Sequence, residues 1–266
     1  MPSWVLFPRF HLAEIEDQPW CPEWIREHVH RALSRMWQTS NTRGGSPAQH
    51  AATILLSSLG GAKAASQYTF IDACAGSGGP TPMLEPAINS VLRREGQKEV
   101  DFVLTDIRPD LERWEEISKK SQHVSFIREP VDALTSGRLV KDGMKECRLF
   151  HLCFHHFDDP EARRVLSSCV RSGDAFIIFE MMHRTIPSLL NTSIVIFSCL
   201  ITTIFDFWWS PMHLFFTGRT DKEITALLRQ QQPKLDLDGW EFRSGEETVL
   251  LPFGRMYWYS GVKRTS

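Results

Sequence analysis

The sequence predicts an α/β fold in which helices cover both faces of a mostly parallel β-sheet that has an antiparallel edge. Three observations support this prediction. Short apolar segments typical of buried strands alternate with helical segments from residue 69 to residue 179. A turn of small residues follows the first apolar segment, at residues 74–79. Two further strand-like segments, residues 240–243 and 256–262, come late in the chain and can supply the edge.

The composition indicates one α/β domain with additions, because 266 residues are enough to bury a sizeable core. The net charge of −2 and the absence of long basic runs argue against nucleic acid as a partner. The six cysteines form no CxxC pair and no His–Cys cluster, so we expect neither a metal site nor a disulfide framework. The amino-terminal segment is too short and too interrupted by proline to be a signal peptide, so we expect a cytoplasmic location.

Residues 1–66 are predicted to form a helical cap. Residues 23–36 carry apolar side chains at mixed helical spacing, which indicates an amphipathic helix. A second helix is expected at residues 48–59, where Gly60 and Gly61 stop it.

A second and larger domain is predicted for residues 67–266. Its first five strands are expected at residues 69–73, 100–105, 124–127, 149–154 and 175–179. The helices between them are expected at residues 82–94, 110–120 and 161–169. This alternation predicts parallel strands joined by helical crossovers. The aromatic alternation in residues 256–262 indicates a strand at the edge of the sheet.

A carboxylate and a turn of small residues close the first strand. The strand ends near Asp72, and the turn contains Cys74, Gly76 and Gly78. Open α/β sheets bind nucleotides with an acid at a strand end, a turn of small residues and the start of a helix. Glycine in the turn lets the ligand approach the backbone closely. The spacing Asp-x-Cys-x-Gly-x-Gly resembles motif I of class I S-adenosylmethionine (SAM) methyltransferases. Cys74 stands where that motif has its first glycine, and we expect its side chain to narrow the turn.

Two further loops carry groups that suit an adenosine. Asp106 ends the second strand, next to Ile107, and an acid at this position can bind both ribose hydroxyls. Asp132 and Ala133 follow the third strand, where a carboxylate can accept from the adenine amine and a backbone N–H can donate to a ring nitrogen. Asp106 could instead be a solvated turn acid, and Asp132 could cap a helix. The order of these loops favours a SAM site.

The segment after the fourth strand adds a family resemblance. Residues 154–160 read Phe-His-His-Phe-Asp-Asp-Pro, and the fifth strand leads to Glu180. Over residues 68–182, these blocks and motif I resemble ubiquinone-methyltransferase-like class I enzymes. The whole chain is similar to a family of uncharacterised fungal methyltransferase-like proteins. The segments that carry this similarity are residues 17–20, 70–82, 154–160, 210–216 and 240–247.

The resemblance implies a Rossmann-like class I methyltransferase sheet, SAM as the cofactor, and a hydrophobic small molecule of fungal secondary metabolism as the substrate. It implies that the cofactor-binding residues are Asp72, Cys74, Gly76, Gly78, Asp106, Ile107, Asp132, Ala133 and Phe154. Methyl transfer from a sulfonium needs alignment, plus a base where the nucleophile carries a proton. His155 is the first candidate for that base because it follows a central strand, although it could equally orient the loop. Glu180, His183 and Asp206 are the other catalytic candidates.

An apolar insertion is expected at about residues 186–217, and Asp206 is the only charged residue between 186 and 216. A membrane span would separate the late strands from their sheet, so we expect a helix that covers a substrate pocket, lies in a membrane interface or is buried in the core. The protein could therefore contact a membrane peripherally. Two other functions stay open, namely a SAM-fold enzyme that catalyses a cyclisation or rearrangement without methyl transfer, and a membrane-surface binding or regulatory protein. The oligomeric state is left open.

Overall fold

One sheet organises the part of the chain that the computed structural model describes, which comprises residues 18, 20–22, 33–40, 45–141, 143–181, 218–230, 235–250 and 254–264. Its seven strands lie in the order β3-β2-β1-β4-β5-β7-β6. Their bounds are β1 Tyr68–Ala73, β2 Phe102–Thr105, β3 Val124–Phe126, β4 Lys145–His151, β5 Ala175–Glu180, β6 Trp240–Leu250 and β7 Gly254–Lys263. The first five strands in this order pair in parallel, whereas β7 pairs antiparallel with β5 and with β6. The predicted sheet, mostly parallel with an antiparallel edge, is confirmed.

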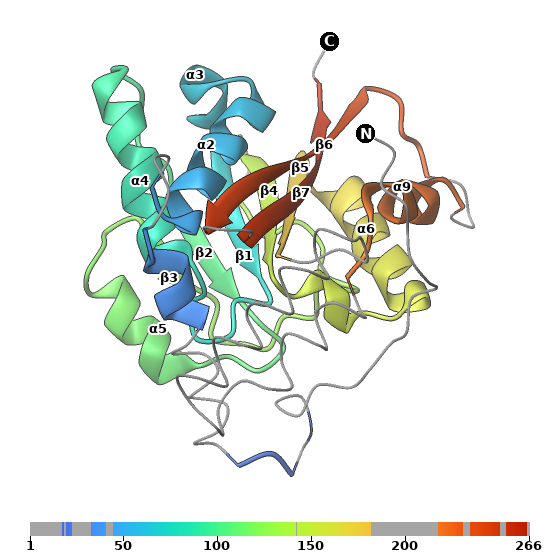
Figure 1. Cartoon of the computed structure of the whole chain (residues 1–266), viewed down its shortest axis with the longest axis horizontal. Helices are drawn as coiled ribbons and strands as arrows, with labels where there is room; N and C mark the ends of the chain where they lie inside the picture. The colour runs from blue at the N-terminus through green and yellow to red at the C-terminus, as the bar shows by residue number, and fades with distance from the viewer. Residues whose placement is uncertain are drawn as a thin grey trace.

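Helices cover both faces of this sheet (Figure 1). Their bounds are α2 Pro47–Leu59, α3 Ala62–Ala65, α4 Thr81–Arg94, α5 Leu111–Ser118, α6 Asp159–Ser172 and α9 Asp221–Arg229, with a 3₁₀ turn, η1, at Phe154–His156. Ile177 and Phe179 of β5 belong to one core cluster, with residues of α2, α4 and α5. Phe176 and Ile178 belong to a second cluster, with residues of α6 and α9. Because neighbouring side chains of a strand point to opposite faces, the two clusters lie on opposite sides of the sheet.

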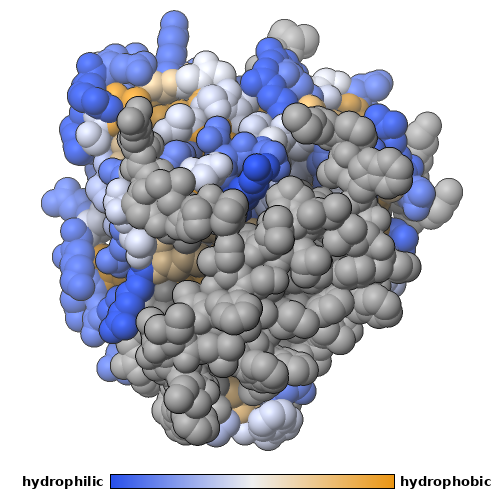
Figure 2. All heavy atoms as spheres, in the orientation of Figure 1, coloured by the Kyte–Doolittle hydropathy of each residue, from blue (hydrophilic) through white to orange (hydrophobic). Residues whose placement is uncertain are grey.

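Local sequence explains where several helices begin and end. Ser46 caps α2 through a capping box, and Gly60 ends the helix with a φ of 96°, as the sequence predicts. Asp158 and Glu161 form a second capping box, which fixes the start of α6 directly after η1. Hydrophilic side chains face solvent around α4 and α5, as Figure 2 shows on its left side.

The predicted fourth strand was placed too far along the chain. We expect residues 149–154 from the apolar pattern, but β4 begins at Lys145 and ends at His151. Two charged residues, Glu146 and Arg148, interrupt the apolar pattern in the first half of the strand. They are nevertheless buried and bonded to each other, with 2.7 Å between Nε and Oε1. Residues 154–156 form η1 instead of a strand.

The predicted edge position of residues 256–262 is also wrong. This segment lies in β7, which pairs with β5 on one side and with β6 on the other. Its aromatic and apolar side chains are buried, including Met256, Tyr257 and Tyr259, whereas Glu246 and Glu247 of the edge strand β6 are exposed. The aromatic alternation therefore indicates packing on both faces rather than an edge.

Part of the predicted organisation lies outside the described residues. Residues 33–38 are helical, within the predicted helix at 23–36, whose earlier part is not described. The apolar insertion at 186–217 is likewise outside, so its position against a pocket or a membrane stays a prediction. Within the described ranges, no helix is both long enough and apolar enough to cross a membrane. The division of the chain at residue 66 also stays a prediction, although α2 packs directly against α4 and the sheet.

Candidate cofactor site and active site

The topology marks the carboxyl ends of β1 and β4 as the place for a ligand. From β1 the chain builds the sheet outward through β2 and β3, and from β4 it builds in the other direction through β5. Open α/β sheets bind ligands at such a switch point. Cys74 and Leu152 are the two described non-glycine residues with a positive φ, of 60° and 54°, and each directly follows one of these two strands. Such backbone conformations cluster at functional sites, so the strain points to the same place.

The acid of the turn is fully engaged inside the protein. Asp72 is buried at the end of β1, and its Oδ2 accepts a hydrogen bond of 2.5 Å from Thr81 Oγ1 at the start of α4. Its other oxygen lies 3.0 Å from Nδ1 of His151 at the end of β4. Asp72 therefore ties two strands and a helix together instead of facing solvent.

The glycines of the turn are required by its backbone. Gly76 and Gly78 have φ angles of 51° and 100°, which lie in the left-handed region that favours glycine. A Cβ atom on Gly78 would also lie 2.3 Å from Cδ1 of Ile117 in α5. Trp114, also in α5, donates from Nε1 to the carbonyl oxygen of Gly76 at 2.8 Å. The turn is thus held from outside by α5.

Hydrogen bonds join the three predicted adenosine-binding segments. The backbone N–H of Gly76 donates to Asp106 Oδ2 at 2.9 Å, which links the turn to the end of β2. The carbonyl oxygen of Asp106 accepts from the N–H of Val131 at 2.8 Å, which links it to the loop after β3. In that loop Asp132 Oδ1 accepts from the N–H of Leu134 at 2.9 Å, so Asp132 caps a turn. Sequence reasoning placed these segments in the correct order, and the structure brings them together.

The side chains next to these bonds differ in exposure. Ile107 is 59% exposed, which leaves a large apolar side chain in water directly beside Asp106. Ala133 is nearly buried and packs in the second core cluster, where the loop after β3 meets α6. An apolar surface next to a carboxylate is suited to an adenine ring and its ribose.

The Cys74 side chain packs beside the cofactor turn, against the core cluster that contains Cys153 and Phe154. The Cys153 thiol donates to the carbonyl oxygen of Ala73 at 3.7 Å and also forms a hydrogen bond with Cys74. That hydrogen bond and burial raise the pKa of Cys153 well above its ordinary value, so this thiol stays protonated at neutral pH. The core thus accommodates a side chain at the position where motif I has glycine.

His155 and Glu180, both predicted catalytic candidates, lie in contact. His155 Nδ1 is 2.9 Å from Glu180 Oε2, and the backbone N–H of His155 donates to Oε1 at 3.2 Å. Both side chains are buried, with 2% of His155 exposed. The ring of His156 stacks on that of His155, with centroids 4.5 Å apart, because η1 does not alternate its side chains as a strand would. His183 and Asp206 lie outside the described residues.

Arg219 holds the turn that carries His155. Its guanidinium donates to the carbonyl oxygens of Phe154 and Phe157, at 2.8 and 2.5 Å, and lies over the Phe154 ring. A third acceptor is Asp159 Oδ1, at 3.1 Å. Burial lowers the pKa of Arg219, an effect that the hydrogen bond to Asp159 opposes. Phe154, predicted to contact the cofactor, is buried under this cation and between aromatic rings.

His151 is the site residue that sequence reasoning missed. The misplaced fourth strand put His151 in a strand interior, whereas it is the last residue of β4 and bonds to Asp72. A polar residue that ends a central strand beside the acid of the turn is the signal that could have revealed it. No group of His, Cys, Asp and Glu suited to a metal ion occurs among the residues searched, which are those described above.

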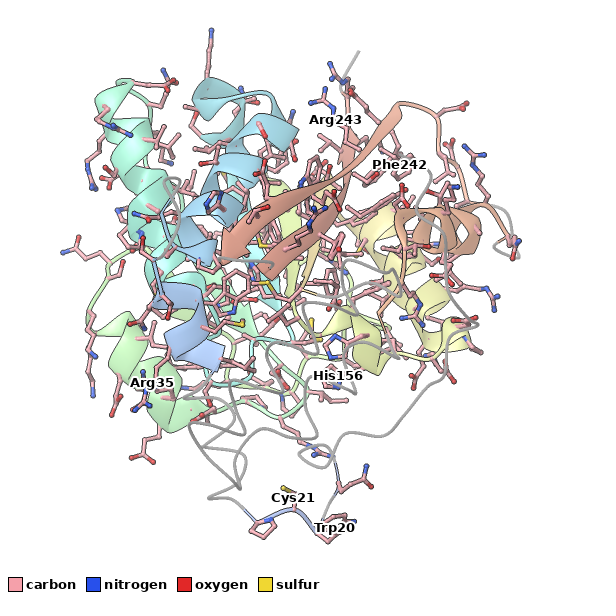
Figure 3. All side chains as sticks on the ribbon, in the orientation of Figure 1. Trp20, Cys21, Arg35, His156, Phe242 and Arg243 are labelled. Carbon is pink, nitrogen blue, oxygen red and sulfur yellow. The ribbon has the colours of Figure 1, made fainter. Side chains whose placement is uncertain are left out.

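A cavity of about 210 Å³ lies away from these residues, among α2, the start of β4 and the β6–β7 pair. Arg243 lines it, and Figure 3 shows Arg243 near the top of the view and His156 well below it. The cavity is therefore separate from the carboxyl ends of the central strands.

No protein-family model and no curated protein sequence matches the chain. Among solved structures, it is similar to an O-methyltransferase family protein from Burkholderia thailandensis, with a TM-score of 0.52 and 18% identity over 91% of this chain and 60% of that chain. It is also similar to the methyltransferase domain of bacterial CtHen1-C, with a TM-score of 0.50 and 11% identity over 83% of this chain and 98% of that chain. The chain thus spans 60% of the length of the first of these proteins. At such identities the likeness concerns the fold, and the fold of this chain is the Rossmann-like fold of class I methyltransferases.

Proposed function

We propose that the protein binds SAM and transfers its methyl group to a hydrophobic small molecule. The observation that carries this proposal is the hydrogen-bonded linkage of three segments at one end of the sheet. Gly76 of the turn bonds to the Asp106 side chain, and Asp106 bonds through its backbone to the loop of Asp132. A site of this extent, built from a close-approach turn, an acid and an adenine-sized loop, suits an adenosine with a substituent at its 5′ carbon.

Each segment would contact a different part of the cofactor. Asp106 would accept from the ribose hydroxyls, while Ile107 would cover one face of the adenine. Asp132 and the N–H of Ala133 would bind the adenine edge, and the turn from Gly76 to Gly78 would lie closest to the chain that bears the sulfur. Bound SAM supplies an electrophilic methyl group on a positively charged sulfur.

His155 is proposed as the general base, with Glu180 as its positioning residue. A carboxylate that accepts from Nδ1–H fixes the neutral tautomer, so Nε2 is the nitrogen that would take the proton of a substrate hydroxyl or amine. Glu180 also accepts from the backbone N–H of His155, which fixes the turn as well as the ring. Sequence reasoning treated Glu180 as a separate candidate base, and its contact with His155 supports the positioning role instead.

The apolar nature of the substrate is supported by the residues around His155. Phe154 begins η1 and Phe157 follows it, with ring centroids 5.9 Å apart, and 11% of the chain is aromatic. Together with the resemblance to fungal proteins, this composition supports a hydrophobic metabolite of fungal secondary metabolism as the acceptor.

Calorimetry with S-adenosylhomocysteine, followed by mass analysis of products, tests this function. We expect micromolar binding by the full chain and a product heavier by one methyl group when SAM and an apolar phenol or amine are supplied. A product of unchanged mass that forms only with SAM present would favour a rearrangement without methyl transfer. Absence of binding for both SAM and S-adenosylhomocysteine at millimolar concentration would refute the proposal.

A further inference from the structure

The imidazole of His151 carries a buried nitrogen that has no partner among the residues that the structure describes. Its side chain is 3% exposed, and Nε2 forms no hydrogen bond within the structure. The ring is held firmly, because it stacks on Phe179 with centroids 5.5 Å apart and meets the edge of Trp37 at 5.8 Å. Buried polar atoms are nearly always satisfied in folded proteins, so an orphaned nitrogen in a rigid ring needs an explanation.

The hydrogen bond of Nδ1 determines whether Nε2 of His151 is a donor or an acceptor. Nδ1 faces Asp72 Oδ1 at 3.0 Å, and an ionised carboxylate can only accept, so Nδ1 carries a hydrogen. In the neutral ring Nε2 is then an acceptor. The second oxygen of Asp72 accepts from the hydroxyl of Thr81. Because this hydroxyl and the neutral imidazole both carry no charge, neither donor compensates the negative charge of Asp72. A buried acceptor backed by a carboxylate favours a positively charged donor.

A second His–Asp pair shows that burial is the decisive difference. His123 Nδ1 lies 2.9 Å from Asp101 Oδ1, nearly the same distance, but the His123 and Asp101 side chains are 30% and 61% exposed. His123 Nε2 also lies 3.7 Å from Glu99 Oε2, and water can reach this partly exposed pair. Nε2 of His151 is shielded from bulk water and has no partner among the described residues, so it can accept a hydrogen bond from a ligand that enters the site.

The position of His151 identifies the ligand. His151 ends β4 and contacts the acid that ends β1, directly before the turn of Cys74, Gly76 and Gly78. Since the proposed function places the sulfur-bearing chain of SAM over this turn, the group within reach is the amino-acid end of that chain. This end carries an ammonium, which is a charged donor with three hydrogens.

We infer that the Asp72–His151 pair recognises the ammonium group of the cofactor, with Nε2 of His151 accepting its hydrogen bond. The inference rests on the proposed function and adds to it a residue that selects ligands by their amino group. The Asp72 carboxylate acts through the imidazole, as a positioning residue that fixes the tautomer. The strained backbone of Leu152, which directly follows His151, is part of the same strand end.

Three adenosine ligands distinguish the contact between His151 and the ammonium group from the other contacts of the cofactor. S-adenosylhomocysteine carries the ammonium and the carboxylate, its decarboxylated analogue keeps only the amine, and 5′-methylthioadenosine has neither group. Calorimetry on the full chain should give the first two at least a tenfold advantage over methylthioadenosine. In His151→Phe, which keeps the aromatic packing against Phe179, this advantage should vanish while methylthioadenosine affinity stays within twofold.

Two more variants keep the test decisive. His123→Phe removes the exposed imidazole of the matched pair and should leave all three affinities unchanged. If His151→Phe does not fold, as judged by circular dichroism, a second variant replaces it. The shorter amide of His151→Asn can still donate to Asp72 but places no acceptor at the position of Nε2, so this variant should lose the advantage too.

Four results would overturn the inference. Equal weakening of all three ligands in the His151 variants would assign His151 a structural role. Loss of the advantage by the decarboxylated analogue in the unmodified protein would mean that the carboxylate, rather than the ammonium, is the recognised group. If the unmodified protein binds methylthioadenosine as tightly as the other two, the proposed function stands and the inference fails. Binding of none of the three refutes the proposed function itself, and the inference with it.

Discussion

Two histidine–carboxylate pairs flank the carboxyl end of β4, and they differ in how they are built. The Asp72–His151 pair joins the next-to-last residue of β1 to the last residue of β4, with 3.0 Å between Nδ1 and Oδ1. The Glu180–His155 pair joins a strand end to the 3₁₀ turn η1, with 2.9 Å between Nδ1 and Oε2. Both histidines are buried, so neither distance nor burial distinguishes the pairs.

The elements that carry them do distinguish them. His151 lies in the sheet, where its ring stacks on Phe179 and meets the edge of Trp37. His155 lies in a turn whose position depends on Glu180 and Arg219. An acceptor carried by the sheet is suited to holding a ligand, whereas the position of a histidine in a 3₁₀ turn depends on side chains from other segments. We therefore propose a binding function for the first pair and a catalytic function for the second.

The largest effect is expected from His155→Ala, because loss of a general base typically lowers the rate by about 10²- to 10⁴-fold. The affinity for SAM should stay within a few-fold, since all proposed cofactor contacts except Phe154 lie on other segments. Single-turnover kinetics with calorimetry on the same samples measures both quantities.

His156→Ala is the matched control for this variant, because His156 stacks on His155 and is only partly buried. We expect a much smaller loss of rate. If His156→Ala lowered turnover more than His155→Ala, the general base would be His156 and not His155. If SAM affinity fell with turnover in His155→Ala, the two pairs would not be divided between binding and catalysis.

Asp106→Ala should weaken SAM binding by about 1.5–3 kcal/mol, the range for a lost charged hydrogen bond. The Asp106 carboxylate also accepts from the N–H of Gly76 and of Arg108, so its removal loosens the turn as well. Calorimetry measures the affinity, and urea unfolding reports the change in stability. Asp101→Ala, at an exposed acid just before β2, is the control and should bind SAM normally. An unchanged affinity in Asp106→Ala would remove this residue from the site.

Arg219→Lys should affect the Glu180–His155 pair alone. Lysine keeps the charge but cannot reproduce the donors that Arg219 directs at Phe154 and Phe157, so η1 should loosen. We expect a loss of about tenfold in turnover, well below the loss of the base itself. The affinity for S-adenosylhomocysteine should not change, because Asp72 and His151 are held by the sheet. A parallel fall in affinity would show that the two pairs are coupled.

The local sequence was sufficient for much of the fold and for the cofactor segments. Apolar strands, capping residues and the glycines of the turn act over a few neighbouring residues, so their positions could be predicted closely. Asp106 and Asp132 could be placed because each follows a recognisable strand. The function of those residues in binding stays a prediction.

The parts of the fold and the site that could not be predicted depend on contacts between residues that are distant in the sequence. Glu146 and Arg148 are compatible with a buried strand because they bond to each other, and Arg148 also donates to Ser168 at 2.7 Å. No periodicity reveals such a network, and missing it displaced β4 and concealed His151. The contact between His155 and Glu180 joins residues 25 positions apart, so the sequence could suggest two bases but not one base with its positioning residue.

The smallest effect is expected at Cys74, whose backbone is strained beside the Asp72–His151 pair. A non-glycine residue with a φ of 60° costs about 1–2 kcal/mol, which Cys74→Gly would relieve. Glycine loses about 0.5–1 kcal/mol through the freedom of the unfolded chain, and the contact with Cys153 is lost too. These effects nearly cancel, so Cys74→Gly should change the free energy of unfolding by less than about 1 kcal/mol.

Cys74→Ala isolates the strain, because alanine also lacks the thiol but keeps the Cβ atom that conflicts with this backbone. Urea unfolding should therefore show Cys74→Ala less stable than Cys74→Gly by about 1 kcal/mol. If the two variants are equally stable, the strand end of the Asp72–His151 pair stores no strain, and its backbone conformation is no argument for binding. If the difference appears and S-adenosylhomocysteine affinity is the same in both, the strain belongs to the turn and the ligand does not release it.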